Sequence, residues 1–201
     1  MLAIVLARKN IREFDQTVSL YTREIGKVEV LAKGIKKIVS KNSSNLEILS
    51  VVEVEIIQGK DIDYLGRVQP IKIFKNIYSD LDKISLSAYI VKITDINILA
   101  GEKDEGIFNL VFSFLEFLDS SELVRSSQLA TSFIFKLWHC LGFSESDTVS
   151  DGWVESSWET VNGLDLSRAE IAQSYDLAHK FAQRHIGVKL AKFIENDRIT
   201  M

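Results

Sequence analysis

The chain is poor in cysteine and proline. Among its 201 residues there is one cysteine, Cys140, and one proline, Pro70. A lone cysteine excludes a disulfide within the chain and any metal site built from several cysteines, and it fits a reducing, cytoplasmic location. Pro70 has no N–H to donate, so we expect it near the end or on the edge of a strand.

Long apolar runs are missing as well. No stretch reaches eighteen apolar residues, so no transmembrane helix is expected. The first residues, MLAIVLARKN, have no basic region before their short apolar run and do not resemble a signal peptide. We therefore expect a cytoplasmic protein without a membrane partner.

Sequence motifs typical of catalysis are absent too. The chain contains no Gly-x-Ser-x-Gly, Walker-type or Gly-x-Gly-x-x-Gly motif. His139 adjoins Cys140, but neighbouring helical residues point about 100° apart and are poorly placed to share a metal or form a nucleophile pair. Asp61 and Asp63 fit a polar turn better than a catalytic carboxylate pair. We expect no enzymatic activity, no metal and no cofactor.

Charge is distributed unevenly along the chain. Residues 1–80 hold 13 Lys and Arg against 10 Asp and Glu, whereas residues 81–201 hold 11 against 18. The basic excess lies early, because residues 1–41 hold 9 basic and 4 acidic side chains. A basic front half favours a polyanionic partner. On charge alone, however, a solvated surface without a partner is the commoner outcome.

Alternating polar and apolar residues predict strands in the first eighty positions. Gly26 lies at the tip of a tight connection, and Gly66 marks a bulge or bend. Five short strands without a helix long enough for a parallel crossover predict a small antiparallel barrel. An OB-fold is the natural candidate, and an SH3-like barrel is the alternative. The expected strands cover residues 2–8, 15–22, 27–32, 46–58 and 61–74.

From residue 79 onward, apolar residues recur every three or four positions, which predicts helices. Ser167 and Glu170 have the spacing of a capping box. Trp153 and Trp158, in a stretch that resembles a loop (144–163), either fill the helical core or mark a contact surface. The fold class is therefore α+β, with an OB-fold domain over 1–79 and an all-α domain over 80–201. The expected helices cover residues 79–101, 107–118, 129–142, 167–185 and 188–195.

A basic loop follows the third strand. Lys33, Lys36 and Lys37 crowd beside Gly34, which allows close backbone approach, and lysines neutralise nucleic-acid phosphates whatever the sequence. Tyr21 or Tyr64 could stack on bases, although a tyrosine in a strand more often belongs to the core. The candidate DNA-binding residues are Arg8, Lys9, Arg12, Arg23, Lys27, Lys33, Gly34, Lys36, Lys37 and Lys41.

Several motifs in their order along the chain resemble a known family. Residues 21–27 read YTREIGK, residues 32–37 read AKGIKK, and residues 52–55 read VEVE. Residues 137–143 and 185–193 are similar to the helix end and the C-terminal segment of the same family. Together these segments resemble the bacterial RecO family of DNA repair proteins over nearly the whole chain.

The resemblance implies a recombination mediator rather than an enzyme, working in the cytoplasm at the nucleoid. Such proteins combine an OB-fold with a helical domain, bind single- and double-stranded DNA, and anneal complementary strands. They act with RecR, bind the acidic tail of single-stranded DNA-binding protein (SSB), which ends in phenylalanine, and help to load RecA. An RNA-binding OB-fold protein is the alternative. The cations expected to rim an SSB-tail pocket are Lys136, Lys180, Arg184, Lys189 and Lys192.

The chain departs from the family pattern in two places. Many members carry a four-cysteine zinc module after the helix that ends here near Phe143, but residues 144–163 contain no cysteine, so zinc is expected to be absent. Near the basic loop, Ile38 and Ile48 replace prolines, and Val39 replaces a basic residue. DNA binding is therefore expected to be weaker or to use other side chains.

Overall fold

The computed structural model describes residues 1–36, 45–143 and 148–186. The chain divides into two compact units. The first combines Met1–Phe74 with Val91–Phe112, and the second combines Lys75–Ile90 with the residues from Ser113 onward. Residues 91–112 therefore belong with the barrel, a grouping that periodicity does not reveal. The expected division into a domain over 1–79 and a domain over 80–201 stays a prediction.

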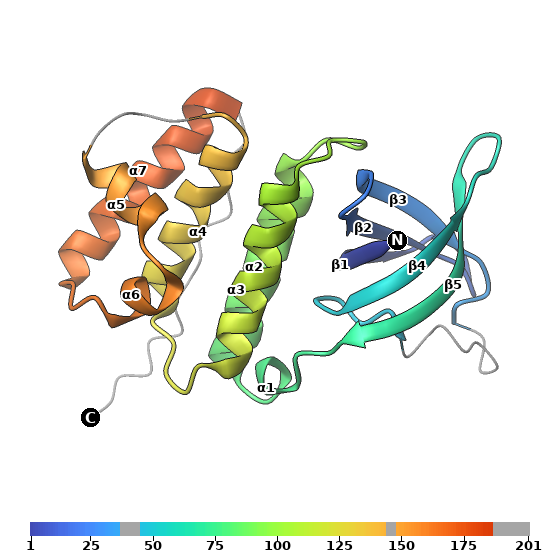
Figure 1. Cartoon of the computed structure of the whole chain (residues 1–201), viewed down its shortest axis with the longest axis horizontal. Helices are drawn as coiled ribbons and strands as arrows, with labels where there is room; N and C mark the ends of the chain where they lie inside the picture. The colour runs from blue at the N-terminus through green and yellow to red at the C-terminus, as the bar shows by residue number, and fades with distance from the viewer. Residues whose placement is uncertain (37–44, 144–147, 187–201) are drawn as a thin grey trace. The chain divides into compact units, whose positions relative to one another are not determined.

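Five strands of the first unit form a closed barrel in the spatial order β1-β2-β3-β5-β4 (Figure 1). This confirms the five-stranded, OB-like barrel expected from the alternation. Gly26 opens the third strand with a φ of +76°, as its place in a tight connection requires. The strands are β1 (Leu2–Asn10), β2 (Gln16–Thr22), β3 (Gly26–Ala32), β4 (Val51–Ile57) and β5 (Asp63–Lys72).

The barrel is antiparallel except where β3 meets β5. There Val30 pairs with Asp63 and Leu31 with Tyr64 in parallel orientation, whereas the other four neighbouring pairs are antiparallel. A ring of five strands cannot alternate direction all the way round, so closure forces one parallel pair. Alternation within single strands cannot show where that pair falls.

Aliphatic side chains fill the barrel interior. Alternate residues of each strand point inward, as the pleat requires, and most are completely buried. The expected bulge at Gly66 is present, since two steps along β4, from Val54 to Ile56, match three along β5, from Val68 to Leu65. A second irregularity lies next to Pro70. The buried cluster comprises Ala3, Val5, Val18, Leu20, Val30, Ala32, Ile35, Leu46, Val52, Val54 and Val68.

The strand expected to start at residue 46 begins only at Val51, so that start was wrong. Residues 46–50 form a turn in which Ser50 donates from its backbone N–H to the Glu47 carbonyl at 3.1 Å. Leu49 has a φ of 77°, which does not fit a strand. The apolar pattern there reflects Leu46, which is buried in the barrel from a non-strand position.

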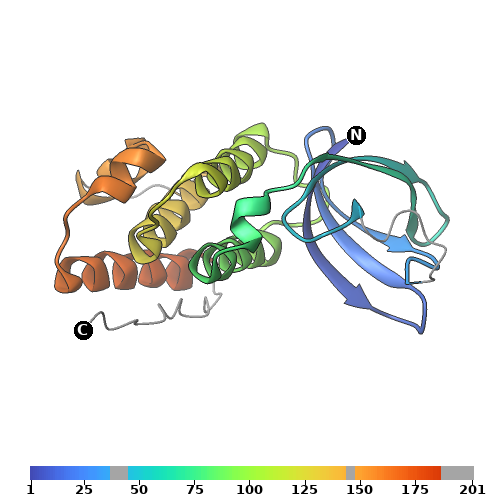
Figure 2. The same ribbon diagram turned by 90° about the horizontal axis from the view of Figure 1, so that it is seen from below.

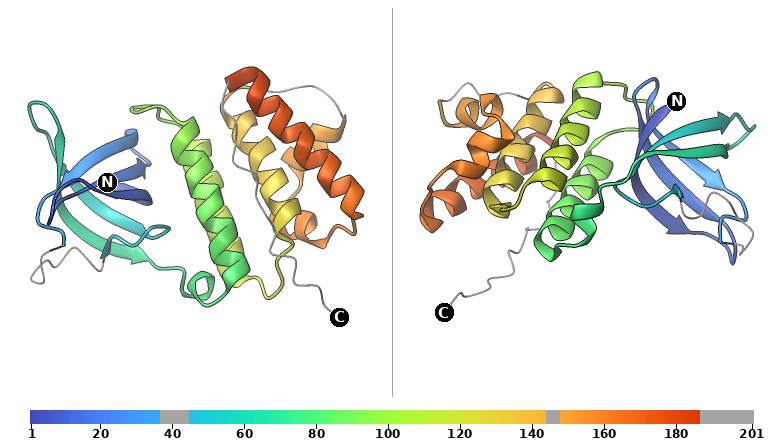
Figure 3. Two further views of the ribbon diagram at one scale, coloured as in Figure 1. Left: turned by 180° about the vertical axis from the view of Figure 1, so that it is seen from behind. Right: turned by 60° about the horizontal axis from the view of Figure 1, so that its bottom comes forward.

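The second unit consists of helices. The helix expected over 79–101 is α2, and that over 107–118 is α3. Each of them is divided between the two units: the chain passes from the second unit to the first at Ile90 within α2, and back to the second at Phe112 within α3. Within the second unit α4 and α7 lie side by side (Figure 3). The helices are α1 (Lys75–Tyr78), α2 (Leu81–Asn97), α3 (Glu105–Ser120), α4 (Ser126–Cys140), α5 (Thr148–Glu155), α6 (Trp158–Gly163) and α7 (Arg168–Ile186).

Residues 148–163 contain helices where a loop was expected. The polar composition of α5 and α6 prevents their prediction from the sequence, because serine, threonine and glycine are typical of loops as well as of helix ends. Ser157 caps α6 by accepting a hydrogen bond at its Oγ from the Thr160 backbone N–H at 3.2 Å. The loop assignment was wrong for this part of the chain.

Both tryptophans of that region lie in the core of the second unit. Trp153 is 7% and Trp158 is 9% exposed. The Trp158 ring meets Phe114 edge-on at 4.8 Å between centroids, and its Nε1 donates to Ser113 Oγ at 3.3 Å. Of the two interpretations made from the sequence, the structure therefore favours core filling.

The last described helix, α7, has the expected capping box. Ser167 N–H donates to Glu170 Oε2 at 2.9 Å, and Glu170 N–H donates back to Ser167 Oγ at 3.3 Å. The Ser167 hydroxyl, which donates to Glu170 Oε2 at 2.6 Å, and the Ser167 backbone N–H together lower the pKa of the Glu170 carboxyl below its ordinary value. The helix expected over 188–195 lies outside the described residues.

None of the described helices is long and apolar enough to cross a bilayer. In residues 1–36, 45–143 and 148–186, no three His, Cys, Asp or Glu side chains come together in a way that could hold a metal ion. The expected absence of zinc stays a prediction.

Candidate nucleic-acid interface

Two turns meet at one end of the barrel. The backbone N–H of Gly34 donates to Asp15 Oδ1 at 2.7 Å, and that of Lys36 donates to the Phe14 carbonyl at 3.2 Å. The β1–β2 turn also closes on itself, because Ile11 N–H donates to the Asp15 carbonyl at 3.1 Å. We call residues 11–15 and 33–36 together the basic turn pair.

The basic turn pair gathers exposed cations. Arg12, Lys33 and Lys36 are exposed on it, and Lys9 is exposed where β1 leads into the first turn. Gly34 has a φ of +64°, a conformation that favours glycine, so its place among the lysines is required by the turn itself. The structure thus brings five of the predicted DNA-binding residues to one end of the barrel.

Two residues of this region were not among those predicted from the sequence. Asp15 supplies the carboxylate that joins the two turns, a role signalled only by its place before a strand. Phe14 is 42% exposed beside the same cations. Tyr64, already a candidate, lies under the Lys33 ammonium at 4.4 Å from Nζ to the ring centroid. Cations and aromatic rings therefore occur together in this region, the combination that proteins use to bind single-stranded nucleic acids.

Arg8 is engaged inside the first unit. Its Nε and its second terminal nitrogen donate to Gln16 Oε1 at 3.0 and 2.8 Å, and its first terminal nitrogen donates to the Leu46 carbonyl at 3.0 Å. Glu47 lies 3.8 Å from the same guanidinium, which is only 16% exposed. The structure gives Arg8 a role in holding the 46–50 turn, separate from the basic turn pair.

Lys27 is similarly engaged. Its ammonium donates to the backbone carbonyls of Asp95 and, at 3.1 Å, Ile98, and it lies 3.1 Å from the Asp95 carboxylate. Ser19 Oγ donates to the same carboxylate at 2.5 Å. A cation at the carbonyl end of α2 is favourable. Lys27 therefore anchors α2 to the barrel within the first unit.

Arg23 lies at the other end of β2 from the basic turn pair. Its guanidinium is 3.5 Å from Glu105, donates to Asn109 Oδ1 at 3.2 Å and covers the Phe108 ring at 5.2 Å. About half of the side chain is exposed. The length of β2, about 20 Å at the usual rise per residue, separates Arg23 from the other exposed cations. Lys37 and Lys41 lie outside the described residues.

The candidate tail-binding cations fall on or near the last helices. Lys136 is fixed within the second unit, where it donates to the carbonyls of Val154 and, at 2.8 Å, Ser156, and lies 5.1 Å from the centre of the Trp158 ring. Burial lowers the pKa of Lys136, an effect that nearby Cys140 opposes. Lys180 is exposed on α7.

The other tail-binding candidates are less completely described. Arg184 lies on α7 four residues after Lys180, which places both residues on one face of the helix. Lys189 and Lys192 lie outside the described residues. The helical spacing therefore assigns two of the five candidate cations to one face of α7.

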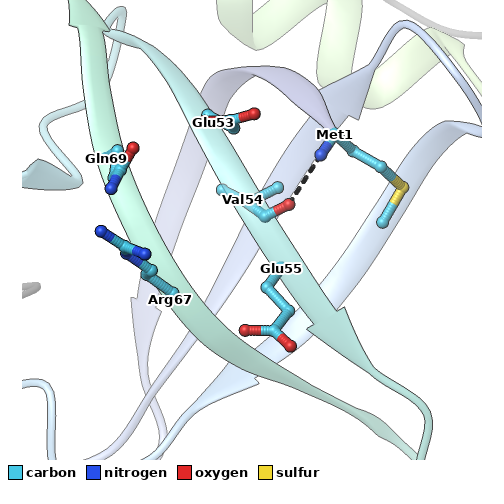
Figure 4. A pocket seen from close by; sticks show the side chains of 6 residues that line it. All are labelled: Met1, Glu53, Val54, Glu55, Arg67 and Gln69. Carbon is cyan, nitrogen blue, oxygen red and sulfur yellow. Dashed lines mark hydrogen bonds between the residues drawn. The ribbon is translucent and has the colours of Figure 1, made fainter.

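A separate hollow of about 230 Å³ lies on the outside of the barrel where β4 and β5 meet the N-terminus (Figure 4). The Met1 ammonium donates to the Val54 carbonyl at 2.8 Å. Two carboxylates, a guanidinium and an amide complete the lining, so the hollow has mixed charge and does not favour a polyanion. Its residues are Met1, Glu53, Val54, Glu55, Arg67 and Gln69.

The first unit is thus an OB-like barrel, and one end of it carries exposed cations and aromatic rings. Residues 1–74 match the family described as "Recombination protein O N terminal". The chain is 26% identical over 141 residues to the DNA repair protein RecO of Desulfitobacterium hafniense, which covers 70% of this chain and 50% of that relative.

Two further relatives carry the same name. Identity is 32% over 126 residues with the DNA repair protein RecO of Geobacter metallireducens, covering 63% of this chain and 52% of the relative. With the DNA repair protein RecO of Desulforamulus reducens it is 29% over 142 residues, covering 71% and 53%. The chain spans about half the length of the curated relatives it matches. These matches confirm the resemblance to the RecO family.

Proposed function

We propose that this chain acts in DNA repair as a RecO-like recombination mediator, which binds single- and double-stranded DNA and anneals complementary strands. The observation that carries the proposal is the basic turn pair, in which Asp15 joins the two turns that expose Arg12, Lys33 and Lys36 at one end of an OB-like barrel. The similarity to proteins named RecO supports the same role.

The proposed mechanism is electrostatic. Exposed lysine and arginine side chains neutralise phosphates and release condensed counterions, whatever the base sequence. Annealing brings two polyanions together, so the same neutralisation lowers the repulsion between strands. The chain acts by binding, without a catalytic step.

The partners follow from the family resemblance. We propose that the protein works in the cytoplasm at the nucleoid with RecR, binds the acidic C-terminal tail of SSB and helps RecA to load on SSB-coated DNA. The α7 face that carries Lys180 and Arg184 is the proposed tail contact, because cations there complement an acidic peptide.

Annealing of two complementary oligonucleotides, with and without an SSB coat, tests the proposal. We expect the full chain to accelerate annealing, and the triple variant Arg12→Ala, Lys33→Ala, Lys36→Ala to lose most of this effect. The control replaces the exposed Lys75, Lys92 and Lys103, which removes the same charge elsewhere. Equal annealing by all three proteins, or tight binding only of strands with a 2′-hydroxyl, would contradict the proposal.

A further inference from the structure

An apolar row crosses the outer face of the barrel. Tyr64 on β5 pairs with Ile57 on β4 and with Leu31 on β3, and residues directly opposite one another project from the same face of a sheet. The adjacent residues Ile56 and Leu65 pack against the barrel core, so this row points outward. Ile57 is 51% exposed. Figure 2 shows the strands of this barrel from a second direction.

The Tyr64 ring in the middle of this row is held and covered. A Cβ added to Gly59 would lie 2.8 Å from Tyr64 Cε2, so the backbone of the β4–β5 hairpin lies against the ring edge. The Lys33 ammonium covers the ring at 4.4 Å from the centroid. The ring is thus positioned by backbone on one edge, while its cover is a flexible, exposed side chain.

We propose that Tyr64 is a stacking platform for a base of single-stranded nucleic acid, and that Lys33 covers the platform until the base arrives. This inference rests on the proposed function and adds that the barrel distinguishes single-stranded from double-stranded nucleic acid. Stacking of a base on an aromatic ring is stronger than an exposed contact between a cation and a ring. The incoming base therefore displaces Lys33, which moves to the adjacent phosphate.

The platform separates single strands from duplexes. In a duplex the base faces are stacked on one another, so Tyr64 adds nothing, whereas the lysines contact phosphates of either form. The hairpin tip also carries the exposed carboxylate of Asp61, and Asp63 Oδ1 accepts a hydrogen bond from the Gly59 backbone N–H at 3.2 Å. With Lys60 exposed at the same tip, the hairpin keeps one net negative charge, so phosphates are drawn to Lys33 and Lys36 rather than to the tip.

The test uses the full chain with three probes of equal length: a single-stranded DNA, the same strand without bases, and a duplex. We expect Tyr64→Leu to weaken single-strand binding about tenfold and to leave the abasic strand and duplex within about twofold. Tyr64→Phe keeps the ring and should keep the affinity. A fluorescent base analogue should be quenched on the wild type and on Tyr64→Phe, and not on Tyr64→Leu.

Other outcomes overturn the inference. An equal loss on all three probes would make Tyr64 a structural residue, and unchanged single-strand binding with unchanged quenching would place stacking elsewhere. A single-stranded RNA probe shows whether the platform binds DNA or RNA more tightly, since both present unpaired bases. If the wild type binds no probe, the proposed function itself is contradicted. If the wild type binds but the Tyr64 substitutions leave single-strand affinity unchanged, only the stacking platform is contradicted. Circular dichroism of each variant checks that it is folded.

Discussion

The backbone N–H of Gly34 and the Asp15 carboxylate, 2.7 Å apart, join two turns that are nineteen residues apart in the chain. This hydrogen bond brings Lys33 and Lys36 beside Arg12. An acidic residue thus organises a cationic surface, and its contribution is geometric although its charge opposes DNA binding.

The two roles of Asp15 separate in a pair of variants. Asp15→Asn keeps an oxygen that can accept from Gly34 and removes the negative charge, so we expect equal or tighter DNA binding. Asp15→Ala removes the acceptor, and we expect about 1 kcal/mol lower stability and several-fold weaker binding. Denaturant unfolding and fluorescence anisotropy measure these effects. Tighter binding by both variants would mean that Asp15 acts through charge alone.

Gly26→Ala and Gly101→Ala are a second pair of variants to compare. Their φ angles are +76° and +77°, so alanine at either position suffers a backbone strain of about 1–2 kcal/mol. A Cβ on Gly26 would also lie 2.1 Å from the Glu102 carbonyl oxygen, whereas nothing lies within 4 Å of one on Gly101. We expect Gly26→Ala to lower the free energy of unfolding clearly more than Gly101→Ala. Equal losses would show that the barrel and residues 99–103 are not packed as described.

Much of this fold could be predicted from the sequence, because local patterns carry it. Alternation located the barrel strands, and the spacing of Ser167 and Glu170 located the start of α7. The parallel pairing of β3 with β5 could not be predicted, since it follows from closing a ring of five strands. The turn at 46–50 was mistaken for the start of a strand, because Leu46 is buried in the barrel core without being in a strand.

The candidate site was predictable only in part. Composition identifies cations, but it does not distinguish exposed ones from those already bound within the protein. Lys33 and Lys36 are exposed, whereas Lys27 and Arg8 are held by partners that lie 68 and 38 residues further along the chain. Such partners are set by tertiary structure, so no local motif could show that Lys27 anchors a helix.

Lys136 provides a test that depends on pH. Burial lowers its pKa below the ordinary value of 10.5, so just below that value the folded state binds fewer protons than the unfolded state. Stability therefore rises with pH in this interval, and the rise should be missing in Lys136→Met. Urea unfolding of both proteins from about pH 8 to pH 10 measures the difference. Parallel curves for the two proteins would contradict a half-buried, charged Lys136.

The tail contact should depend on α7 rather than on Lys136. We expect Lys180→Glu with Arg184→Glu to abolish binding of an acidic peptide that ends in phenylalanine, because like charges then face one another. DNA binding should be unaffected, since the basic turn pair is unchanged. Calorimetric titration of the full chain measures peptide binding, and Lys75→Glu with Lys92→Glu, two exposed lysines outside α7, is the control with the same change of charge. Peptide binding retained by the double variant would place the pocket elsewhere.

Salt dependence distinguishes phosphate contacts from other effects of mutation. If Arg12, Lys33 and Lys36 each contact one phosphate, replacing all three by alanine should flatten the plot of log affinity against log salt concentration by about two units on single strands. The loss should be the same for any base sequence. Lys27→Met removes a cation that is bound to Asp95 and Ile98, so it should lower stability and leave the salt slope unchanged. A triple variant with the wild-type slope, or a flattened slope in Lys27→Met, would show that DNA follows another path across the barrel.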